Sequence, residues 1–372
     1  MNNQQKYRHT SAHRRIAALL LATLACCLLL LSACGSTASP TTSAGGIPTP
    51  LPTPSISPTL RNQGDMQLQA FQQWISLLQQ NQGDVTTYQQ QYSSDQQALS
   101  SAKTGSDYQA ALQTLTKHVE GIKLPAMKAQ ALALQQQLKQ QVSDFGKQHT
   151  YHDTYNGVTY PQGYEYGDNG IGSWIQDEIT SAQTLADFQQ VVEDEQMWLS
   201  NFAAMKADFG DKTPYNQPHK SDLQLMQQYG YMDKRMVVVS LAEQAMRIYD
   251  HGKLVKAFLV TTGRPDKPTP PGSWWVEGKK SPTVFKADVP KSSPYWYPDT
   301  PINYAMQYHS NGYFLHDSWW RADYGPGTNF PHQDSSGDSF SAQGSHGCVN
   351  LSKADAGWVY GFVIVYTKVM IY

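Results

Sequence analysis

Residues 344–351, Gly-Ser-His-Gly-Cys-Val-Asn-Leu, are the stretch of this 372-residue sequence that decides the fold. They place Cys348 directly after a glycine and two residues after His346. The other three cysteines lie within residues 26–34, so no disulfide framework is expected. A lone cysteine is often an inert packing residue, but here the glycine permits a tight turn and an imidazole can stabilise a thiolate. We therefore interpret Cys348 as a reactive thiol.

Outward from this motif, the last third of the chain shows strand patterns. A second segment, Tyr-Phe-Leu-His-Asp at residues 313–317, places His316 at the end of an apolar strand. Runs of β-branched and aromatic residues predict further strands, and the glycine-containing turn at 250–252 predicts a hairpin. The expected strands are residues 236–241, 245–249, 254–262, 274–276, 303–308, 313–316 and 369–372. The sequence therefore predicts a β-rich domain over residues 231–372.

These segments together resemble the catalytic domain of the L,D-transpeptidases of the YkuD family, whose signature is a histidine followed at variable distance by Ser-His-Gly-Cys. The similarity extends over residues 236–372 in the family's order, with Val-Val-Ser-Leu at 238–241, Thr-Gly at 262–263, Thr-Pro-Pro-Gly at 269–272 and Leu-His at 315–316. The resemblance implies a β-sandwich or barrel. It also implies an enzyme that cross-links peptidoglycan stem peptides through a cysteine thioester and releases D-Ala from a tetrapeptide donor.

The resemblance also implies catalytic roles. Cys348 corresponds to the nucleophile and His316 to the general base, and an imidazole with a pKa near about 6.5 suits proton transfer. His346 is given an assisting role, and the backbone N–H groups of Gly347 and Cys348 suit an oxyanion. Asp317 is expected to orient His316 through its carbonyl or its carboxylate. The pKa of the activated thiol is expected to lie below the usual value of about 8.5.

Substrate contacts are expected around these residues. Many family members carry an arginine two residues after the cysteine, where this chain has Asn350. The long segment 319–343 is interpreted as a lid over the cleft, and His332 within it is an alternative base. The residues expected to bind substrate are Asn350, Ser345, Trp320 and Tyr304. The aromatic residues expected to line the stem-peptide groove are Trp319, Trp320, Tyr324 and Phe330.

Three rival interpretations use the same part of the chain. His316, His332, His346 and Cys348 are ligand types for zinc, but no Cys-x-x-Cys or helical His-x-x-x-His spacing occurs, so no metal and no cofactor is expected. The intact histidine, glycine and cysteine argue against a wall-binding module with a dead site. Water or a protein amine could replace the acceptor stem, and the sequence leaves the acceptor open. Carbapenems, which present a strained acyl group to the same thiolate, are expected inhibitors.

The N-terminus is expected to carry an export signal. Basic residues precede an apolar run from Ile16 to Leu31, and Leu-Ser-Ala-Cys at 31–34 resembles the lipobox of bacterial lipoproteins. This resemblance implies cleavage before Cys34, lipidation of Cys34 and a location on the outer face of the cytoplasmic membrane. An uncleaved signal anchor is the alternative, because the 18-residue apolar segment from Ile16 to Ala33 is just long enough to span a bilayer. A tether rich in proline, serine and threonine follows.

Residues 63–230 are rich in glutamine, and their leucine and aromatic residues recur at helical spacing. Asp84, Ser106 and Pro125 stand where helices begin, and a strong helix is expected over residues 184–209. The histidines of this region show no spacing typical of a site: His118, His149, His152 and His219. A spacer, a wall-binding module and a partner-docking module all remain open for it.

The sequence thus predicts an α+β multidomain protein. Its expected parts are a lipoprotein signal peptide (1–33), a tether (34–62), a helical domain (63–230) and a catalytic domain (231–372). The expected partners are the donor and acceptor stem peptides and, through the lipid anchor, the membrane. A net charge of −2 with 16% charged residues argues against nucleic acid as a partner.

Overall fold

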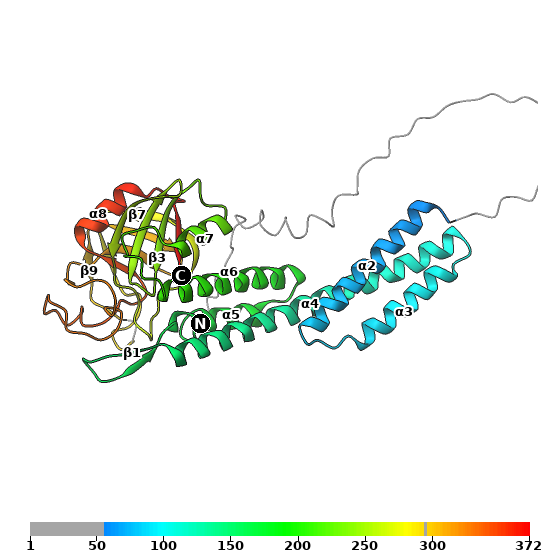
Figure 1. Cartoon of the computed structure of the whole chain (residues 1–372), viewed down its shortest axis with the longest axis horizontal. Helices are drawn as coiled ribbons and strands as arrows, with labels where there is room; N and C mark the ends of the chain where they lie inside the picture. The colour runs from blue at the N-terminus through cyan, green and yellow to red at the C-terminus, as the bar shows by residue number, and fades with distance from the viewer. Residues whose placement is uncertain (1–55, 294–295) are drawn as a thin grey trace, which may run out of the picture. The chain divides into compact units, whose positions relative to one another are not determined.

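The computed structural model describes residues 56–293 and 296–372 (Figure 1). The expected signal peptide, Cys34 and most of the tether therefore lie outside the described residues. Within the described ranges, no helix has the combination of length and apolar character needed to cross a bilayer. The described residues divide into two compact units, one of residues 56–73 with 86–120 and one of residues 74–85 with 121–372.

The first unit is a helical bundle. It contains parts of α2 (Pro58–Gln80) and α4 (Gly105–Gln148) and all of α3 (Thr86–Ser101). Phe71 is fully buried, and its ring centroid lies 6.1 Å from that of Tyr92 and 6.4 Å from that of His118. Phe71 is therefore part of the packed core of this unit.

Pro125 does not begin a helix, because it lies inside α4. A proline within a helix removes one backbone hydrogen bond and costs about 3 kcal/mol or more. Ile122, Ala126 and Met127 are buried on both sides of Pro125. Packing of these neighbours keeps the backbone helical through the proline, which is why the predicted helix start is wrong.

The second unit begins with helical structure that leads into the sheets. Its elements are β1 (Thr150–His152), β2 (Thr159–Pro161), η2 (Tyr164–Tyr166), α5 (Ile171–Ser181), α6 (Leu185–Phe209) and α7 (Lys220–Gln228). Thr184 and Asp187 form a capping box at the start of α6, in which each side chain accepts a backbone N–H of the other. The helix predicted over residues 184–209 is thus confirmed.

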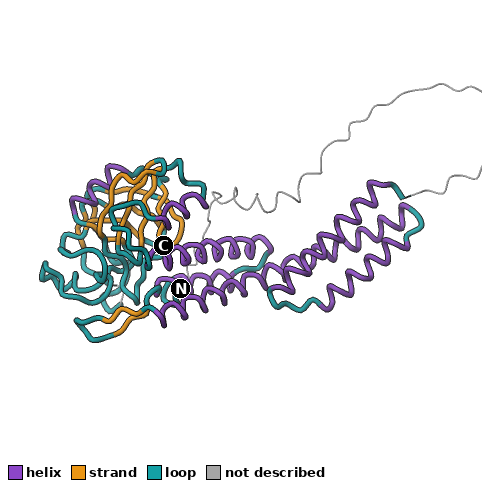
Figure 2. Tube along the Cα trace, in the orientation of Figure 1, coloured by secondary structure: helices purple, strands orange, loops and turns teal. Residues whose placement is uncertain are grey.

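A five-stranded sheet forms one layer of the β structure (Figure 2). Its strands are β3 (Arg235–Ser240), β4 (Ala245–Asp250), β5 (Lys253–Leu259), β6 (Gly272–Trp275) and β13 (Lys368–Ile371). Their order is β5-β4-β3-β13-β6, and β13 runs parallel to β3. The hairpin predicted around residues 250–252 joins β4 to β5.

A four-stranded sheet forms the second layer, in the order β12-β11-β10-β7. Its strands are β7 (Gly278–Lys280), β10 (Ala305–His309), β11 (Tyr313–Asp317) and β12 (Val349–Leu351), followed by α8 (Lys353–Phe362). A separate pair joins β8 (Thr283–Phe285) to β9 (Thr300–Ile302). Val237 and Ile248 of the first layer share one core with Met306, Leu315 and Val349 of the second. The expected α+β class with a C-terminal β domain is confirmed.

The helical part of the second unit covers the other face of the five-stranded sheet. Trp198 of α6 is 2% exposed, and its indole Nε1–H donates to the carbonyl of Pro271 at 3.1 Å. Asn201, one turn further along α6, donates from Nδ2 to the carbonyl of Ile371 at 3.1 Å. Met236 and Val238 of β3 belong to the same core as this helix. The strands β4, β3 and β13 of the five-stranded sheet are therefore buried on both faces, whereas much of the edge strand β5 is exposed.

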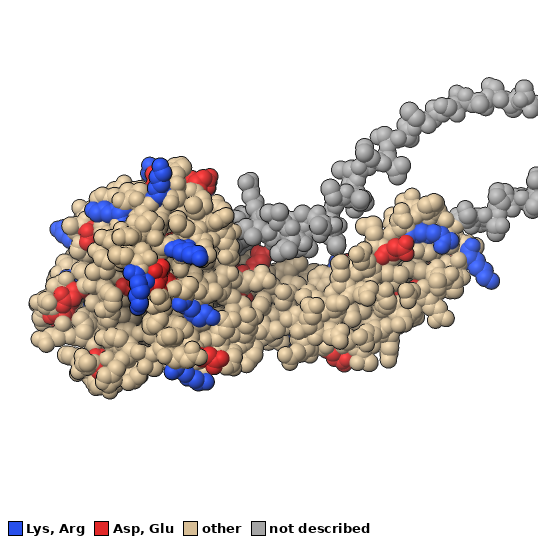
Figure 3. Space-filling view, viewed as in Figure 1, with Lys and Arg blue, Asp and Glu red and all other residues tan. Residues whose placement is uncertain are grey.

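The charged side chains visible on the surface are dispersed. Figure 3 shows Lys and Arg side chains interspersed with Asp and Glu on the face in view. This distribution fits the net charge of −2 and contains no broad basic stripe on that face.

Candidate active site

The two expected catalytic residues lie on neighbouring strands. His316 belongs to β11 and Cys348 directly precedes β12, and these strands pair in parallel. The register joins Leu315 to Val349 and His316 to Asn350. Two residues of strand rise by about 6.6 Å and neighbouring strands lie about 4.8 Å apart. The fold therefore brings together a histidine and a cysteine that are far apart in the sequence.

His316 is held as one tautomer. Its Nδ1 lies 2.9 Å from the carbonyl oxygen of Asp317, which can only accept, so Nδ1 carries the proton and donates it. The lone pair of Nε2 then accepts from the side-chain amide of Asn350 at 3.1 Å. His316 is 4% exposed, and burial lowers its pKa to about 4. The ring is therefore a neutral base at pH values near about 7.

Asp317 makes its hydrogen bond to His316 through its backbone carbonyl, and its side chain acts on His316 through its charge alone. The carboxylate accepts from the backbone N–H groups of Asn303 and Tyr304 at 2.8 and 2.7 Å. It also accepts from the side-chain amide of Asn303 at 2.7 Å. The buried carboxylate therefore fixes the start of β10, and the carbonyl of the same residue orients the imidazole.

The residues before Cys348 form a tight turn. Gly347 has a φ of +104°, and a Cβ at this position would lie 2.5 Å from Cε1 of Tyr313. The hydroxyl of Ser345 accepts from the N–H of Gly347 at 3.0 Å and donates to the carbonyl of Cys348 at 2.5 Å. The Ser345 hydroxyl, expected to bind substrate, and the Gly347 N–H, expected to bind an oxyanion, are both engaged within this turn.

The thiol of Cys348 differs from the activated thiol that the sequence predicts. Its Sγ lies 3.9 Å from the carbonyl oxygen of Gly312, and burial raises its pKa to about 11. A backbone hydrogen bond from Phe314 opposes this effect but does not outweigh it. Because burial lowers the pKa of His316 while it raises that of Cys348, the resting pair is a neutral thiol and a neutral imidazole.

His346 lies beside positive charge. Burial, together with Lys267 and Arg264, lowers the pKa of His346 to about 4. Arg264 also pairs through Nε with the carboxylate of Asp266 at 2.8 Å. A cationic segment therefore lies close to the Ser-His-Gly-Cys turn, on a chain that has Asn350 where many family members have an arginine.

The expected substrate residues take different positions. The ring centroid of Trp320 lies 6.2 Å from that of His316, so Trp320 borders the site. Asn350 is 2% exposed and its side chain is bonded to His316. Tyr304 packs against Tyr360 of α8, with ring centroids 5.5 Å apart.

The segment 319–343, expected to be a lid, is braced from within. Arg321 donates to the carbonyl oxygens of Ser341 and Gln343 at 2.9 and 2.7 Å. Phe330 is 2% exposed and stacks on Tyr151 with ring centroids 4.3 Å apart. Phe330 is therefore buried against the β1–β2 hairpin.

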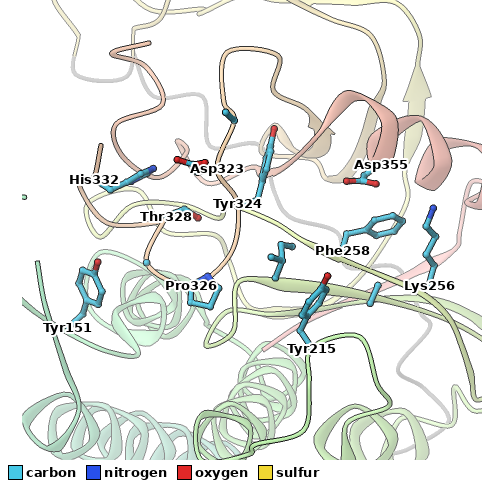
Figure 4. Close-up of a pocket in the computed structure, with 14 residues that line it drawn as sticks. Tyr151, Tyr215, Lys256, Phe258, Asp323, Tyr324, Pro326, Thr328, His332 and Asp355 are labelled. Carbon is cyan, nitrogen blue, oxygen red and sulfur yellow. The ribbon is translucent and has the colours of Figure 1, made fainter. Parts of the chain in front are cut away.

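His332 lies at a different cleft. Figure 4 shows it with Asp323 and Tyr324 around a cleft whose lining includes neither His316 nor Cys348. Its Nδ1–H donates to the carbonyl of Phe330 at 2.8 Å, and its Nε2 lies 3.8 Å from the carboxylate of Asp334. This position favours His316 over His332 as the base.

Two aromatic residues border the site without having been singled out in the sequence. Phe285 of β8 meets the ring of His316 edge-on at 5.1 Å. Tyr297 lies 6.1 Å from the ring of His346, and burial and the nearby Cys348 raise its pKa. In the sequence, Tyr297 belongs to an aromatic run at 295–297 that could have marked it as a candidate site residue. No motif links that run to Cys348, so its place beside the site could not be predicted.

The C-terminal part of the chain is similar in sequence to known proteins. Residues 234–371 match the family model of the YkuD L,D-transpeptidase catalytic domain. L,D-transpeptidase 1 of Mycobacterium tuberculosis is 26% identical over 140 residues, which cover 36% of this chain and 48% of that protein. Residues 234–371 therefore belong to the YkuD L,D-transpeptidase catalytic-domain family. The chain spans about half the length, or less, of the curated relatives it matches.

Solved structures of similar proteins carry related names. The NMR structure of the catalytic domain of the E. faecium L,D-transpeptidase is 30% identical, with a TM-score of 0.31. The match covers 38% of this chain and 100% of that domain. The structure of L,D-transpeptidase LdtMt1 in complex with imipenem is 24% identical, with a TM-score of 0.31, and the match covers 38% of this chain and 59% of that one.

The raised pKa of Cys348 gives a prediction for its alkylation. At any pH below about 11, a raised pKa means less thiolate, so iodoacetamide should modify native Cys348 slowly. Peptide mass spectrometry on the full chain should give a rate at least about tenfold below that of a model thiol at pH 8, rising above pH 9. Alkylation after denaturation is the control and should be fast. A native rate already at its plateau at pH 6 would show a thiolate–imidazolium pair and contradict the prediction.

Proposed function

We propose that this protein is a peptidoglycan L,D-transpeptidase in which Cys348 is the nucleophile and His316 is the general base. The observation that carries the proposal is the neutral, Nδ1-protonated imidazole of His316 on the strand beside Cys348. The family of residues 234–371 supplies the reaction class. The donor is a tetrapeptide stem, and the acceptor is the side-chain amine of a second stem.

Acylation begins with both groups neutral. The thiol of Cys348 transfers its proton to Nε2 of His316 as Sγ attacks the carbonyl carbon that precedes D-Ala. The tetrahedral intermediate collapses when the C–N bond breaks and the imidazolium returns the proton to the departing amine. D-Ala leaves, and the donor stem remains as a thioester on Sγ.

Deacylation uses the same base a second time. The acceptor amine attacks the thioester carbonyl, and Nε2 of His316 takes a proton from that amine. The C–S bond breaks, an amide bond joins the two stems, and the proton returns to the sulfur. The amide of Asn350 occupies the lone pair of Nε2 in the resting state, so it must yield this position to the thiol or the amine in each half-reaction.

An oxyanion donor is needed in both steps. The N–H of Gly347 is engaged by Ser345, so the backbone N–H of Cys348 is the donor that we propose. Arg264 and Lys267 bring positive charge near His346, which suits the carboxylates of stem peptides. Trp320, Phe285 and Tyr297 would form the apolar walls of the donor site.

The proposal predicts a covalent intermediate on one residue. Incubation of the full chain with a tetrapeptide stem should release D-Ala and give one acyl adduct on Cys348 by mass spectrometry, and a carbapenem should give one adduct at the same site. Cys348→Ala should give none. His316→Ala should slow acylation by about 10²- to 10⁴-fold, because it removes the general base.

His332→Ala is the matched control, because His332 is bonded within its own loop. It should change the acylation rate by less than about threefold. Equal losses in His316→Ala and His332→Ala, or a preference for pentapeptide stems ending in D-Ala-D-Ala, would overturn the assignment.

We also propose that Cys34 anchors the protein to the outer face of the cytoplasmic membrane through lipid. This proposal rests on the Leu-Ser-Ala-Cys sequence at 31–34 after an apolar run. Cys34→Ala should abolish labelling by a radioactive fatty acid and shift the protein out of its normal fraction. If the variant is processed and fractionates as the parent does, the lipobox interpretation fails.

A further inference from the structure

The Thr-Pro-Pro-Gly segment at residues 269–272 begins directly against the turn that carries Cys348. Its first residue, Thr269, is fully buried in the loop between β5 and β6. The hydroxyl of Thr269 donates to the carbonyl oxygen of Gly347 at 2.9 Å. A Cβ on Gly347 would lie 3.1 Å from the carbonyl oxygen of Pro268, so the loop and the turn are in close contact. The residue before Cys348 is therefore held from the β5–β6 loop.

The hydroxyl proton of Thr269 has one possible direction. The hydroxyl oxygen lies 2.8 Å from the backbone nitrogen of Gly263, whose N–H can only donate. The carbonyl of Gly347 can only accept, so the hydroxyl accepts from Gly263 and gives its single proton to Gly347. Gly263 is itself fixed, because its carbonyl accepts from the hydroxyl of Tyr164 at 2.6 Å. Thr269 is thus a fixed donor to the Gly347 carbonyl.

This contact determines where the backbone N–H of Cys348 points. The carbonyl of Gly347 and the N–H of Cys348 belong to one peptide group, which is trans, and in a trans peptide these two bonds point in opposite directions. A carbonyl oxygen fixed on Thr269 therefore fixes the direction of the N–H. A hydrogen bond to the carbonyl also polarises the peptide group, which makes its N–H a stronger donor.

Gly347 makes such a contact necessary. Its φ is +104°, and glycine has more backbone freedom than any other residue, so the peptide group that follows it can rotate at low steric cost. Tyr308 donates to the same carbonyl oxygen from its hydroxyl, but the distance of 3.4 Å makes this bond weak. Of these two contacts, the one from Thr269 has the shorter distance and holds the peptide group more firmly.

We infer that Thr269 is a positioning residue for the oxyanion donor, whose hydroxyl keeps the N–H of Cys348 directed at the oxyanion in both half-reactions. This inference rests on the proposed function, in which that N–H is the donor. Thr269 acts through the peptide group and takes no part in proton transfer. Loss of a direct oxyanion donor costs about 10²- to 10³-fold in rate, so loss of a residue that positions the donor should cost less, about 10- to 100-fold.

Two reactions of the Cys348 thiol separate this role from a merely structural one. Acylation by a carbapenem places negative charge on the carbonyl oxygen and needs the oxyanion donor. Alkylation by iodoacetamide displaces iodide from carbon and forms no oxyanion, so its rate depends on the access and the pKa of the thiol.

Thr269→Val in the full chain should change these two rates unequally. Carbapenem acylation should slow by about 10- to 100-fold, because the oxyanion donor is no longer held. Alkylation should change by less than about twofold, because the thiol keeps its surroundings. Mass spectrometry measures both reactions on the same preparation.

Further variants control for folding and for the loss of a buried hydroxyl. Thr269→Ala removes the same hydroxyl with a smaller side chain, so the test does not depend on whether Thr269→Val folds. Thr269→Ser restores the hydroxyl and should be acylated within about threefold of the parent rate. Thr367→Val is the matched control, because Thr367 is 4% exposed and its hydroxyl accepts the N–H of Ile364 at 2.9 Å in the turn between α8 and β13. It should leave both rates unchanged.

Two results would overturn the inference while leaving the proposed function intact. One is acylation at the parent rate in both Thr269→Val and Thr269→Ala. The other is a change in alkylation as large as the change in acylation, which would show that the hydroxyl acts on the thiol or on the fold and not on the oxyanion. A parent protein that a carbapenem does not acylate would instead contradict the proposed function, and this inference with it.

Discussion

Parallel pairing of β11 with β12 is the constraint on which the rest of the site depends. It places His316 opposite Asn350 and positions Cys348 at the entrance of the shorter strand. Parallel neighbours cannot be joined by a tight hairpin and need a long crossover connection. Here the crossover is the segment from Ser318 to Cys348, and the contacts of Arg321 with its carbonyl groups keep it folded. The topology thus requires a long segment between the two strands.

The strands that carry the site are supported by packing against the five-stranded sheet and, through it, against α6. Leu315 and Val349 share a core with the five-stranded sheet, and the far face of that sheet rests on Trp198 and its neighbours in α6. Part of the helical region therefore serves as backing for the catalytic fold.

Local sequence patterns predicted much of the fold, but they did not predict the protonation states and long-range contacts of the site residues. The strand before His316, the helix after Thr184 and the turn at 250–252 each carry a short-range signal that the structure confirms. The helix start predicted at Pro125 is wrong, because the packing of its buried neighbours outweighs the tendency of proline to interrupt a helix. The raised pKa of Cys348 and the contact of His219 with Asp208 arise from burial and from residues distant in sequence. No local pattern could have given either result.

The central claim is that the resting enzyme holds a neutral imidazole at His316, protonated on Nδ1, beside a protonated thiol. The most direct measurement is ¹⁵N NMR of the full chain labelled at histidine, with His316 assigned by comparison with His316→Gln. The account predicts the neutral Nδ1–H tautomer from about pH 6 to about pH 8, because burial lowers the pKa of the ring to about 4 and the carbonyl of Asp317 holds the remaining proton on Nδ1. An imidazolium signal from His316 at pH 7, or the Nε2–H tautomer, would contradict it.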